Sequence, residues 1–246
     1  MSFADRFAQI KQQAGDVDTS YEEKGTISSG KKFNIDEDGI YTVIVESAIF
    51  KESQSSGSAW YDITFKTEDD MKCQTKLFVL NRDGLPYNIN DKGIKKSTFG
   101  WNKMASLNYI LNGEWDGLPV PEEIEIEVYD KEANGRIAKL MPCAKSIMGK
   151  PLDIGVKMVL EDGYPDATQS RSVADVRIFL DAVSGQSSTE KRNGSPAQVK
   201  EDFIKSITEK PEPIDKRDKS KGNGTVASSK NDAPFDTDKK SFGFSK

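Results

Sequence analysis

Hydrophobic and polar residues alternate with period two in two short segments, 59–66 and 72–80. The alternation predicts two β-strands, and the acidic residues 68–70 between them predict the turn that closes a hairpin. The inward face would carry Tyr61, Ile63, Phe65, Cys73, Thr75, Leu77 and Val79. The outward face would bring Trp60 and Phe78 together. The same outward face would hold Lys66, Lys72 and Lys76.

Two further elements flank this hairpin. Residues 40–50 follow the turn signal Asp38-Gly39 and predict a long strand. Its inward residues would be Tyr41, Val43, Val45 and Ile49. Apolar residues at helical spacing predict a helix over 99–112, with Thr98 as its N-cap and Gly113 as its C-cap. We expect Trp101 of this helix to be buried.

The second half of the chain predicts more strands. Residues 123–130 and 136–141 alternate around the turn signal Asn134-Gly135, which predicts a hairpin with glutamates on its outer face. Residues 154–160 predict one more strand. The segment 173–182 fits either a helix capped by Ser172 or an edge strand.

The two ends of the chain differ from its middle. Residues 2–14 predict a short amphipathic helix. A second short helix is predicted to end near residue 210 and to begin at a capping box formed by Ser195 and Gln198. Residues 211–246 have almost no aliphatic side chains, so we expect them to be disordered. The predicted organisation is therefore an N-terminal helix and arm (1–32), a packed domain (33–185), a linker with a short helix (186–210) and a tail (211–246).

The order of these elements is strand, strand, strand, helix, strand, strand, with a sixth strand added. This is the order of the OB-fold, a five-stranded, partly open barrel whose helix lies between strands three and four. We therefore expect a mainly β protein with an OB-fold-like barrel of five to six strands. In that fold the face of strands two and three and the loops 1–2 and 4–5 bind oligonucleotides. These would be the 59–80 hairpin, the loop 51–58 and the turn 130–135.

Composition narrows the function. Only 35% of the 246 residues are hydrophobic, histidine is absent, and the two cysteines, Cys73 and Cys143, lie in separate strand patterns. The cysteines fit reduced core thiols, and without histidine a zinc site is disfavoured. No phosphate-binding or nucleophile-elbow motif is present. We expect no metal, no cofactor and no enzymatic activity, and no segment has the length of a membrane span.

Net charge argues against a simple basic surface. The chain has 35 basic and 40 acidic side chains, a net charge of −5. Residues 187–246 have 13 basic and 10 acidic side chains, so residues 1–186 carry −8. The segment 66–103 nevertheless has 8 basic and 5 acidic side chains, which is a local excess of +3.

Aromatic rings among cations suit a single strand of nucleic acid, because rings stack on bases and cations neutralise phosphates. The stacking candidates are Trp60, Phe78 and Tyr87. The backbone-contacting candidates are Lys66, Lys72, Lys76, Arg82, Lys95, Lys96 and Arg136. A plainer interpretation is that the outward aromatics pack under a loop or a partner subunit. Two alternatives stay open: an adaptor that binds proteins through its sheet face and tail, and a binder of RNA or of double strands.

The opening MSFADRFAQIKQQAG and the central FGWNKMASLNYIL resemble the single-stranded DNA-binding proteins of lytic tailed phages, over residues 1 to about 210. The resemblance implies sequence-independent coating of single strands in replication and recombination, in the cytoplasm of the host cell. It also implies a C-terminal tail that recruits proteins. Such tails usually end in an acidic run, whereas this chain ends DAPFDTDKKSFGFSK, so its partner could be an RNA polymerase or a recombination enzyme. The tail residues in question are Phe235, Asp236, Lys239, Lys240, Phe242, Phe244 and Lys246.

Overall fold

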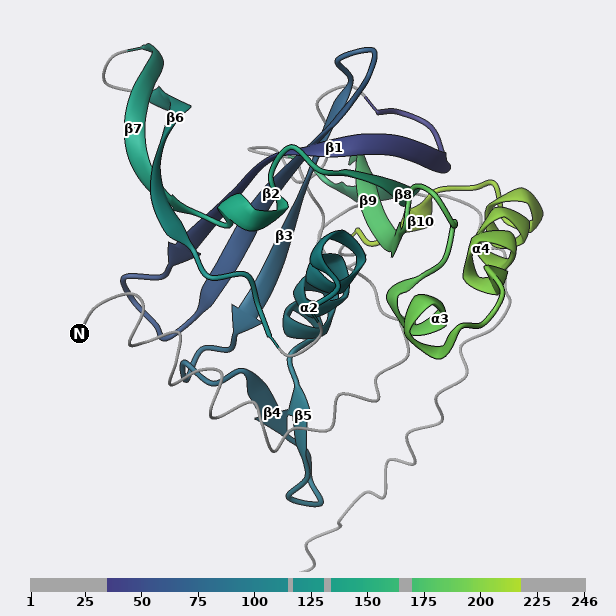
Figure 1. Ribbon diagram of the computed structural model, residues 1–246, viewed down its shortest axis with the longest axis horizontal. Helices are drawn as coiled ribbons and strands as arrows, with labels where there is room; N and C mark the ends of the chain where they lie inside the picture. The colour runs from purple at the N-terminus through teal and green to yellow at the C-terminus, as the bar shows by residue number, and fades with distance from the viewer. Residues whose placement is uncertain (1–34, 115–116, 131–133, 164–169, 218–246) are drawn as a thin grey trace, which may run out of the picture.

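The computed structural model describes residues 35–114, 117–130, 134–163 and 170–217 (Figure 1). The predicted helix over 2–14 and the tail residues from 218 onward lie outside these ranges. The strands are β1 Gly39–Glu52, β2 Ala59–Thr67, β3 Lys72–Leu80, β4 Tyr87–Ile89, β5 Lys95–Ser97, β6 Glu122–Asp130, β7 Gly135–Cys143, β8 Pro151–Asp162, β9 Ser170–Leu180 and β10 Ile214–Asp215. The helices are α2 Phe99–Asn112, the 3-10 turn η1 Lys145–Ile147, α3 Ser188–Asn193 and α4 Gln198–Glu209.

The protein is mainly β, and its central feature is one large sheet that does not close. Eight strands belong to this sheet, in which β10, β8, β1, β2 and β3 are neighbours in that order. β9 pairs with β8, and the β6–β7 hairpin joins the sheet through β1. Among the described residues, every strand pairing is antiparallel except that of β10 with β8. The sequence analysis predicted a barrel of five to six strands, whereas this sheet has eight strands. The strands β4 and β5 form a separate two-stranded ribbon.

β1 is the longest strand, and a β-bulge divides it. The register of β1 against β2 shifts between Val45 and Ser47. Before the bulge Val43 and Val45 are buried, and after it Ala48 and Phe50 are buried instead. The extra residue in the strand reverses which positions face the core. The prediction that Ile49 points inward was wrong for this reason.

Helix α2 packs beside β3 and supplies much of the core (Figure 1). Its predicted caps are confirmed: the side chain of Thr98 accepts from the Trp101 amide, and Gly113 is left-handed with φ 75°. Trp101 is only 4% exposed, which confirms its predicted burial. The hydroxyl of Thr98 also donates to the carbonyl of Phe78 at 3.1 Å, which ties the helix start to β3.

The segment after β8 differs from prediction in two places. Residues 170–180 form strand β9, so the strand interpretation of that segment is the correct one. Helix α3 was not predicted, and it has the reciprocal capping box, between Ser187 and Glu190. Helix α4 begins after Ala197 with no side-chain cap, so the capping box predicted at Ser195 was wrong. The predicted disordered tail begins too early, because Ile214 and Asp215 form strand β10 on β8 and the amide of Lys216 donates to the carbonyl of Leu160.

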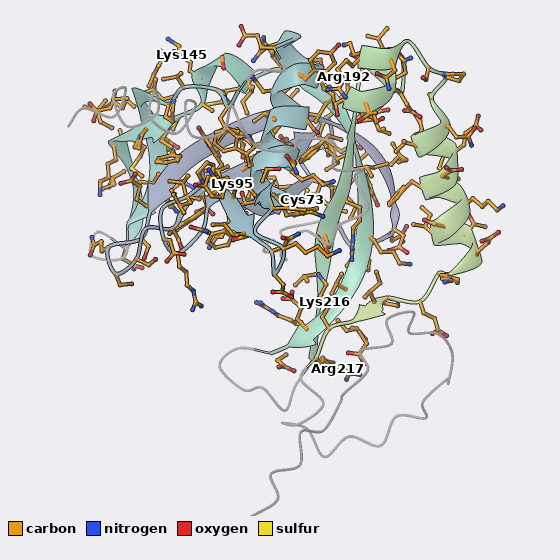
Figure 2. All side chains as sticks on the ribbon, turned by 90° about the horizontal axis from the view of Figure 1, so that it is seen from below. Cys73, Lys95, Lys145, Arg192, Lys216 and Arg217 are labelled. Atoms are coloured by element: carbon orange, nitrogen blue, oxygen red, sulfur yellow. The ribbon has the colours of Figure 1, made fainter. Side chains whose placement is uncertain are left out.

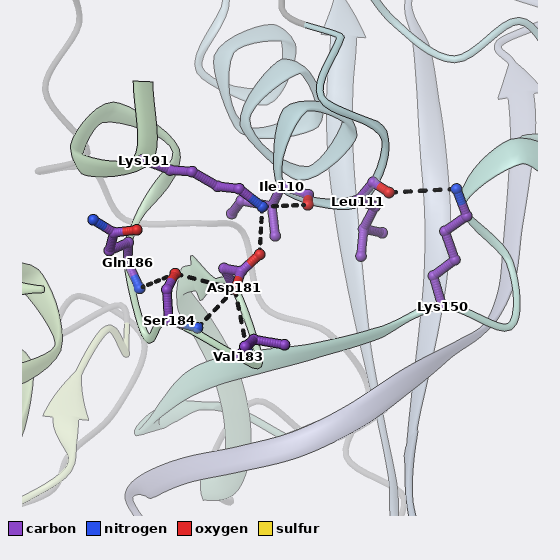
Figure 3. A network of polar contacts seen from close by, with 8 residues as sticks. All are labelled: Ile110, Leu111, Lys150, Asp181, Val183, Ser184, Gln186 and Lys191. Carbon is purple, nitrogen blue, oxygen red and sulfur yellow. Dashed lines mark hydrogen bonds and ion pairs between the residues drawn. The ribbon is translucent and has the colours of Figure 1, made fainter. Parts of the chain in front are cut away.

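Lysines tie the ends of the helices to the sheet (Figure 3). The ammonium of Lys191 on α3 binds the Asp181 carboxylate, just after β9, and lies 3.4 Å from the carbonyl of Ile110 on α2. The ammonium of Lys150 donates to the carbonyl of Leu111 at 3.3 Å. These cations satisfy carbonyls at the C-terminal end of α2 that have no partner within the helix.

In the described ranges, no helix has the length and apolar character needed to cross a membrane.

Candidate nucleic-acid interface

The β2–β3 ladder brings the two predicted aromatic residues together. Trp60 lies directly opposite Phe78, and their ring centroids are 5.5 Å apart with the planes tilted by 42°. Phe78 is 41% exposed. The ammonium of Lys76 lies 5.2 Å from the centre of the Trp60 ring and 6.0 Å from that of Phe78. The structure thus forms an accessible aromatic pair with a cation beside both rings.

A carboxylate that the sequence analysis did not single out organises this pair. The indole N–H of Trp60 donates to Asp62 at 3.1 Å. The ammonium of Lys51, from β1, lies 2.7 Å from Asp62, and that of Lys76 lies 4.0 Å from it. The sequence contained a signal for the contact between Trp60 and Asp62, because residues two apart on a strand lie on the same face. It contained none for the contact between Lys51 and Asp62, which depends on the register of β1 against β2.

The other two predicted lysines of this face are held by carboxylates. Lys66 pairs with Asp70 at 2.7 Å, and Lys72 pairs with Glu46 at 2.5 Å. The hydrogen bond to Asp70 raises the pKa of Lys66, so the lysine is fully charged at neutral pH. Glu46 lies within the β1 bulge. Lys66 and Lys72 are therefore locally neutralised, and a phosphate would have to replace their carboxylate partners.

A pocket of about 450 Å³ continues the face beyond the aromatic pair. It lies where β3 meets the start of α2 and the loop to β4. It is lined by Ser58, Lys76, Leu77, Phe78, Leu80, Asn81, Arg82, Asn88, Thr98, Phe99 and Gly100. The amide of Gly57, in the β1–β2 loop, donates to the carbonyl of Arg82 at 2.8 Å. This bond joins the predicted binding loop to the rim of the pocket.

The β4–β5 ribbon carries the next group of predicted residues. The ammonium of Lys95 lies 4.9 Å from the centre of the Tyr87 ring. Lys96 stands opposite Asn88, which lines the pocket. Among the described residues, no carboxylate forms an ion pair with Arg82, Lys95 or Lys96. Within the described part of the chain, these three cations add charge near the aromatic pair that no carboxylate neutralises.

The structure does not bring Arg136 to this face. The β6–β7 hairpin joins β1 through Cys143 and projects from the sheet (Figure 1). Arg136 pairs with Tyr129 next to the turn, at the end of the hairpin opposite to Cys143. Directly paired residues of antiparallel strands point to the same side. Cys143 pairs with Ile49, and Ile49 pairs with Asp62, so Cys143 lies on the same side of the sheet as the aromatic pair. On the hairpin, Glu122 and Lys139 lie on this side as well, whereas Arg136 lies on the other side.

The same ladder places three glutamates on the far side. Glu123, Glu125 and Glu127 alternate with the residues that continue the aromatic side, and all three are exposed. The acidic strand therefore turns these three carboxylates away from the candidate interface. Ile124 and Ile126, which alternate with these glutamates, are only half-buried because the hairpin projects from the sheet.

Comparison with protein-family models, with curated proteins and with solved structures gives no match to this chain. Among the described residues, no three side chains of the His, Cys, Asp or Glu type are grouped to hold a metal ion.

Proposed function

We propose that this protein binds single-stranded DNA without sequence preference and without catalysing a reaction. The observation that carries the proposal is the accessible Trp60–Phe78 pair with Lys76 beside both rings. Each ring offers a flat apolar surface to a base of any kind, and the cation can bind the phosphate that follows. The pocket beyond Phe78 has room for a further base, with Arg82 at its edge.

Charge would contribute less than stacking. Lys66 and Lys72 are neutralised by nearby carboxylates, whereas Arg82, Lys95 and Lys96 have no carboxylate partner among the residues that the structure describes. A strand that runs from the aromatic pair over the pocket toward the β4–β5 ribbon would meet the latter three in turn. About four phosphates in contact would give a slope near −3 for log affinity against log salt, because a single strand releases about 0.7 ion per phosphate.

We also propose an OB-like relationship for the fold. β1, β2 and β3 precede helix α2, and the β8–β9 hairpin follows it, with β8 paired to β1. In this interpretation β8 and β9 take the places of strands four and five, and the β6–β7 hairpin is an insertion. The aromatic pair then lies on strands two and three, which form the oligonucleotide-binding face of OB-folds.

The resemblance to phage single-stranded DNA-binding proteins supports a role in DNA replication and recombination in the host cytoplasm. In that role the C-terminal tail recruits a polymerase or another DNA-processing protein. The tail residues Phe235 to Lys246 lie outside the described residues. An adaptor that binds proteins through the sheet face is the alternative, and the exposed apolar Phe78 would serve it equally well.

The test is binding of fluorescently labelled oligo-dT, measured by anisotropy across a salt series. We expect a slope near −3. Trp60→Ala and Phe78→Ala should each weaken binding by about 5- to 150-fold, because stacking of one base contributes about 1–3 kcal/mol. Val183→Ala changes a side chain that is 98% exposed in another loop, and it should leave affinity unchanged. No binding, or a slope near zero, would eliminate the proposal.

Competition separates this proposal from its alternatives. Unlabelled poly-dT should displace the labelled strand at far lower concentration than duplex DNA or RNA does. Equal displacement by all three would favour a general anion surface. Failure of all three, together with capture of a protein partner that Phe78→Ala abolishes, would favour the adaptor.

The tail should act separately from DNA binding. Deletion of residues 236–246 removes three lysines and leaves the aromatic pair and the pocket in place. We expect oligo-dT affinity to change by less than about threefold, while the protein contact is lost. A several-fold weaker affinity for oligo-dT would show that the basic terminus touches nucleic acid.

A further inference from the structure

The far side of the β6–β7 hairpin combines an acidic row with an apolar row. Glu123, Glu125 and Glu127 lie on β6, and all three are exposed. Their partners across the ladder are Pro142, Leu140 and Ala138 on β7. Leu140 is 64% exposed. In the part of the chain that the structure describes, none of the three glutamates takes part in an ion pair, in contrast to Glu122, which lies 4.0 Å from Lys145.

The hairpin also has a free edge. Within the described residues β6 pairs only with β7, so its other edge presents unpaired backbone N–H and C=O groups. An edge of this kind is a template for an added strand, and proteins usually cover or protect it. The occupant that fits must supply cations for the glutamates and apolar side chains for the exposed leucine.

The last residues of the chain have this composition in an alternating pattern. The sequence ends KKSFGFSK. In an extended conformation, Lys240, Phe242, Phe244 and Lys246 would point to one side, and Ser241, Gly243 and Ser245 to the other. Two rings flanked by two cations would then face a row of carboxylates next to an exposed leucine.

We propose that residues 239–246 dock on the β6–β7 hairpin of their own chain. The segment lies along the free edge of β6, where Lys240 and Lys246 reach the glutamate row and the two phenylalanines extend over β6 toward Leu140. The contact holds the basic and aromatic terminus away from other proteins until a partner competes for it. It lies on the side of the hairpin that faces away from the aromatic pair, so it stands independently of the proposed DNA binding.

The length of the tail allows this contact within one chain. Figure 2 shows Arg217, where the described chain ends, and Lys145, which lies beside the base of the hairpin, at opposite ends of the molecule. The 21 residues from 218 to 238 span up to about 70 Å when extended. A domain of this size has a diameter of about 40 Å. A tethered segment has an effective concentration in the millimolar range, so even a weak contact is largely formed within the chain.

The experiment uses the full-length chain with a nitroxide on Ser245→Cys, and NMR records the broadening of backbone amides. The label reacts selectively with the new thiol, because Cys73 and Cys143 are buried and burial raises their pKa values to about 12 and about 11. We expect broadening of the amides of residues 123–128 when label and isotope are on the same chain. We expect none when they are on different chains mixed in one sample.

A charge-matched pair of variants tests the glutamate row. Glu123→Gln, Glu125→Gln and Glu127→Gln together should reduce the docked population by about tenfold, because the exposed ion pairs with Lys240 and Lys246 are lost. The control, Glu201→Gln, Glu209→Gln and Glu212→Gln together, makes the same change of charge at exposed positions in or near α4 and should leave the broadening unchanged. Reversing the three hairpin charges to lysine and those of Lys239, Lys240 and Lys246 to glutamate should restore it.

Three results would overturn the proposal. Absence of broadening on β6 would show that the tail does not dock there. Broadening only between chains would identify a second copy as the occupant. Broadening at β2 and β3 instead would show that the tail covers the aromatic pair and competes with DNA. The outcome does not depend on whether oligo-dT binds, so failure of this inference and failure of the proposed function are distinguishable.

Discussion

Asp62 restrains the cations of the candidate interface at the scale of single residues. Its carboxylate accepts from the indole of Trp60 and lies 2.7 Å from Lys51 and 4.0 Å from Lys76. It therefore orients the Trp60 ring and holds two lysines. Under the proposed function it would compete with phosphate for those lysines, and its negative charge in the middle of the face would weaken DNA binding through repulsion.

This balance predicts that Asp62→Asn tightens DNA binding. The asparagine oxygen can still accept from Trp60, while Lys51 and Lys76 become available to phosphates. We expect the salt slope to steepen by up to about 1.4, at about 0.7 for each added phosphate. Oligo-dT anisotropy across a salt series measures both quantities. Asp202→Asn on α4 makes the same change of charge at an exposed site elsewhere and is the control. Weaker binding by Asp62→Asn would show that orientation of the ring outweighs the freed charge.

At the scale of elements, the contact between α2 and β3 shapes the pocket. A Cβ added to Gly100 would lie 2.3 Å from the carbonyl oxygen and 2.5 Å from the amide nitrogen of Phe78. Backbone atoms in a strand cannot move aside cheaply. The glycine therefore lets the first turn of the helix lie directly against the strand that carries Phe78.

Gly100→Ala should consequently destabilise the fold, although alanine normally favours a helix by about 1 kcal/mol over glycine. We expect the free energy of unfolding to fall by about 1–3 kcal/mol, the usual cost of overpacking, and oligo-dT binding to weaken as Phe78 shifts. Urea denaturation measures the first effect. Gly39→Ala is the control, because the atoms nearest to its Cβ would belong to the ring and hydroxyl of Tyr41, at 3.3 Å and beyond, rather than to a strand backbone. An unchanged or higher stability would mean that the helix can move away from β3 without cost.

The elements also show which parts of the structure could be predicted. Strands β2 and β3 and helix α2 follow from local periodicity and caps, and the pairing of Trp60 with Phe78 follows from the short turn between the strands. Ile49 was misplaced because a bulge depends on pairing between distant strands. Lys51 and Glu46 were missed for the same reason. Helix α3 was overlooked because its few residues are almost all polar, and only the capping box marks it.

At the scale of the whole molecule, the positions of charges matter more than their sum. The net charge of −5 disfavours contact with nucleic acid. The acidic row of the β6–β7 hairpin nevertheless lies on the side away from the aromatic pair, while Arg82, Lys95 and Lys96 lie around the pocket and on the neighbouring ribbon. A local positive field beside stacking rings is sufficient for binding of single strands at moderate salt. The same protein should show little affinity for duplex DNA, because tight binding to a duplex requires many phosphate contacts from a broad basic surface.

Acid stability is also a property of the whole molecule, and Asp181 contributes to it because it joins the end of β9 to α3 (Figure 3). Burial raises the pKa of this carboxyl, but the bond from Lys191 and those from Ser184 outweigh burial and lower the pKa to about 2, against an ordinary 3.8. A carboxyl with a lowered pKa stabilises the folded state above its unfolded pKa. That contribution is lost as the pH falls from about 4 to about 2.

Asp181→Asn should therefore lower the free energy of unfolding by about 1–2 kcal/mol at pH 7, a value reduced for solvent screening of the half-exposed Lys191. The difference from the parent chain should shrink below about pH 4 and vanish near pH 2, because the parent carboxyl is then protonated and has lost its ionic attraction to Lys191. Urea denaturation at a series of pH values measures this difference, with Asp202→Asn as the exposed control. A difference that stays constant down to pH 2 would show that the bonds to Ser184, rather than the charge, connect β9 to the helices.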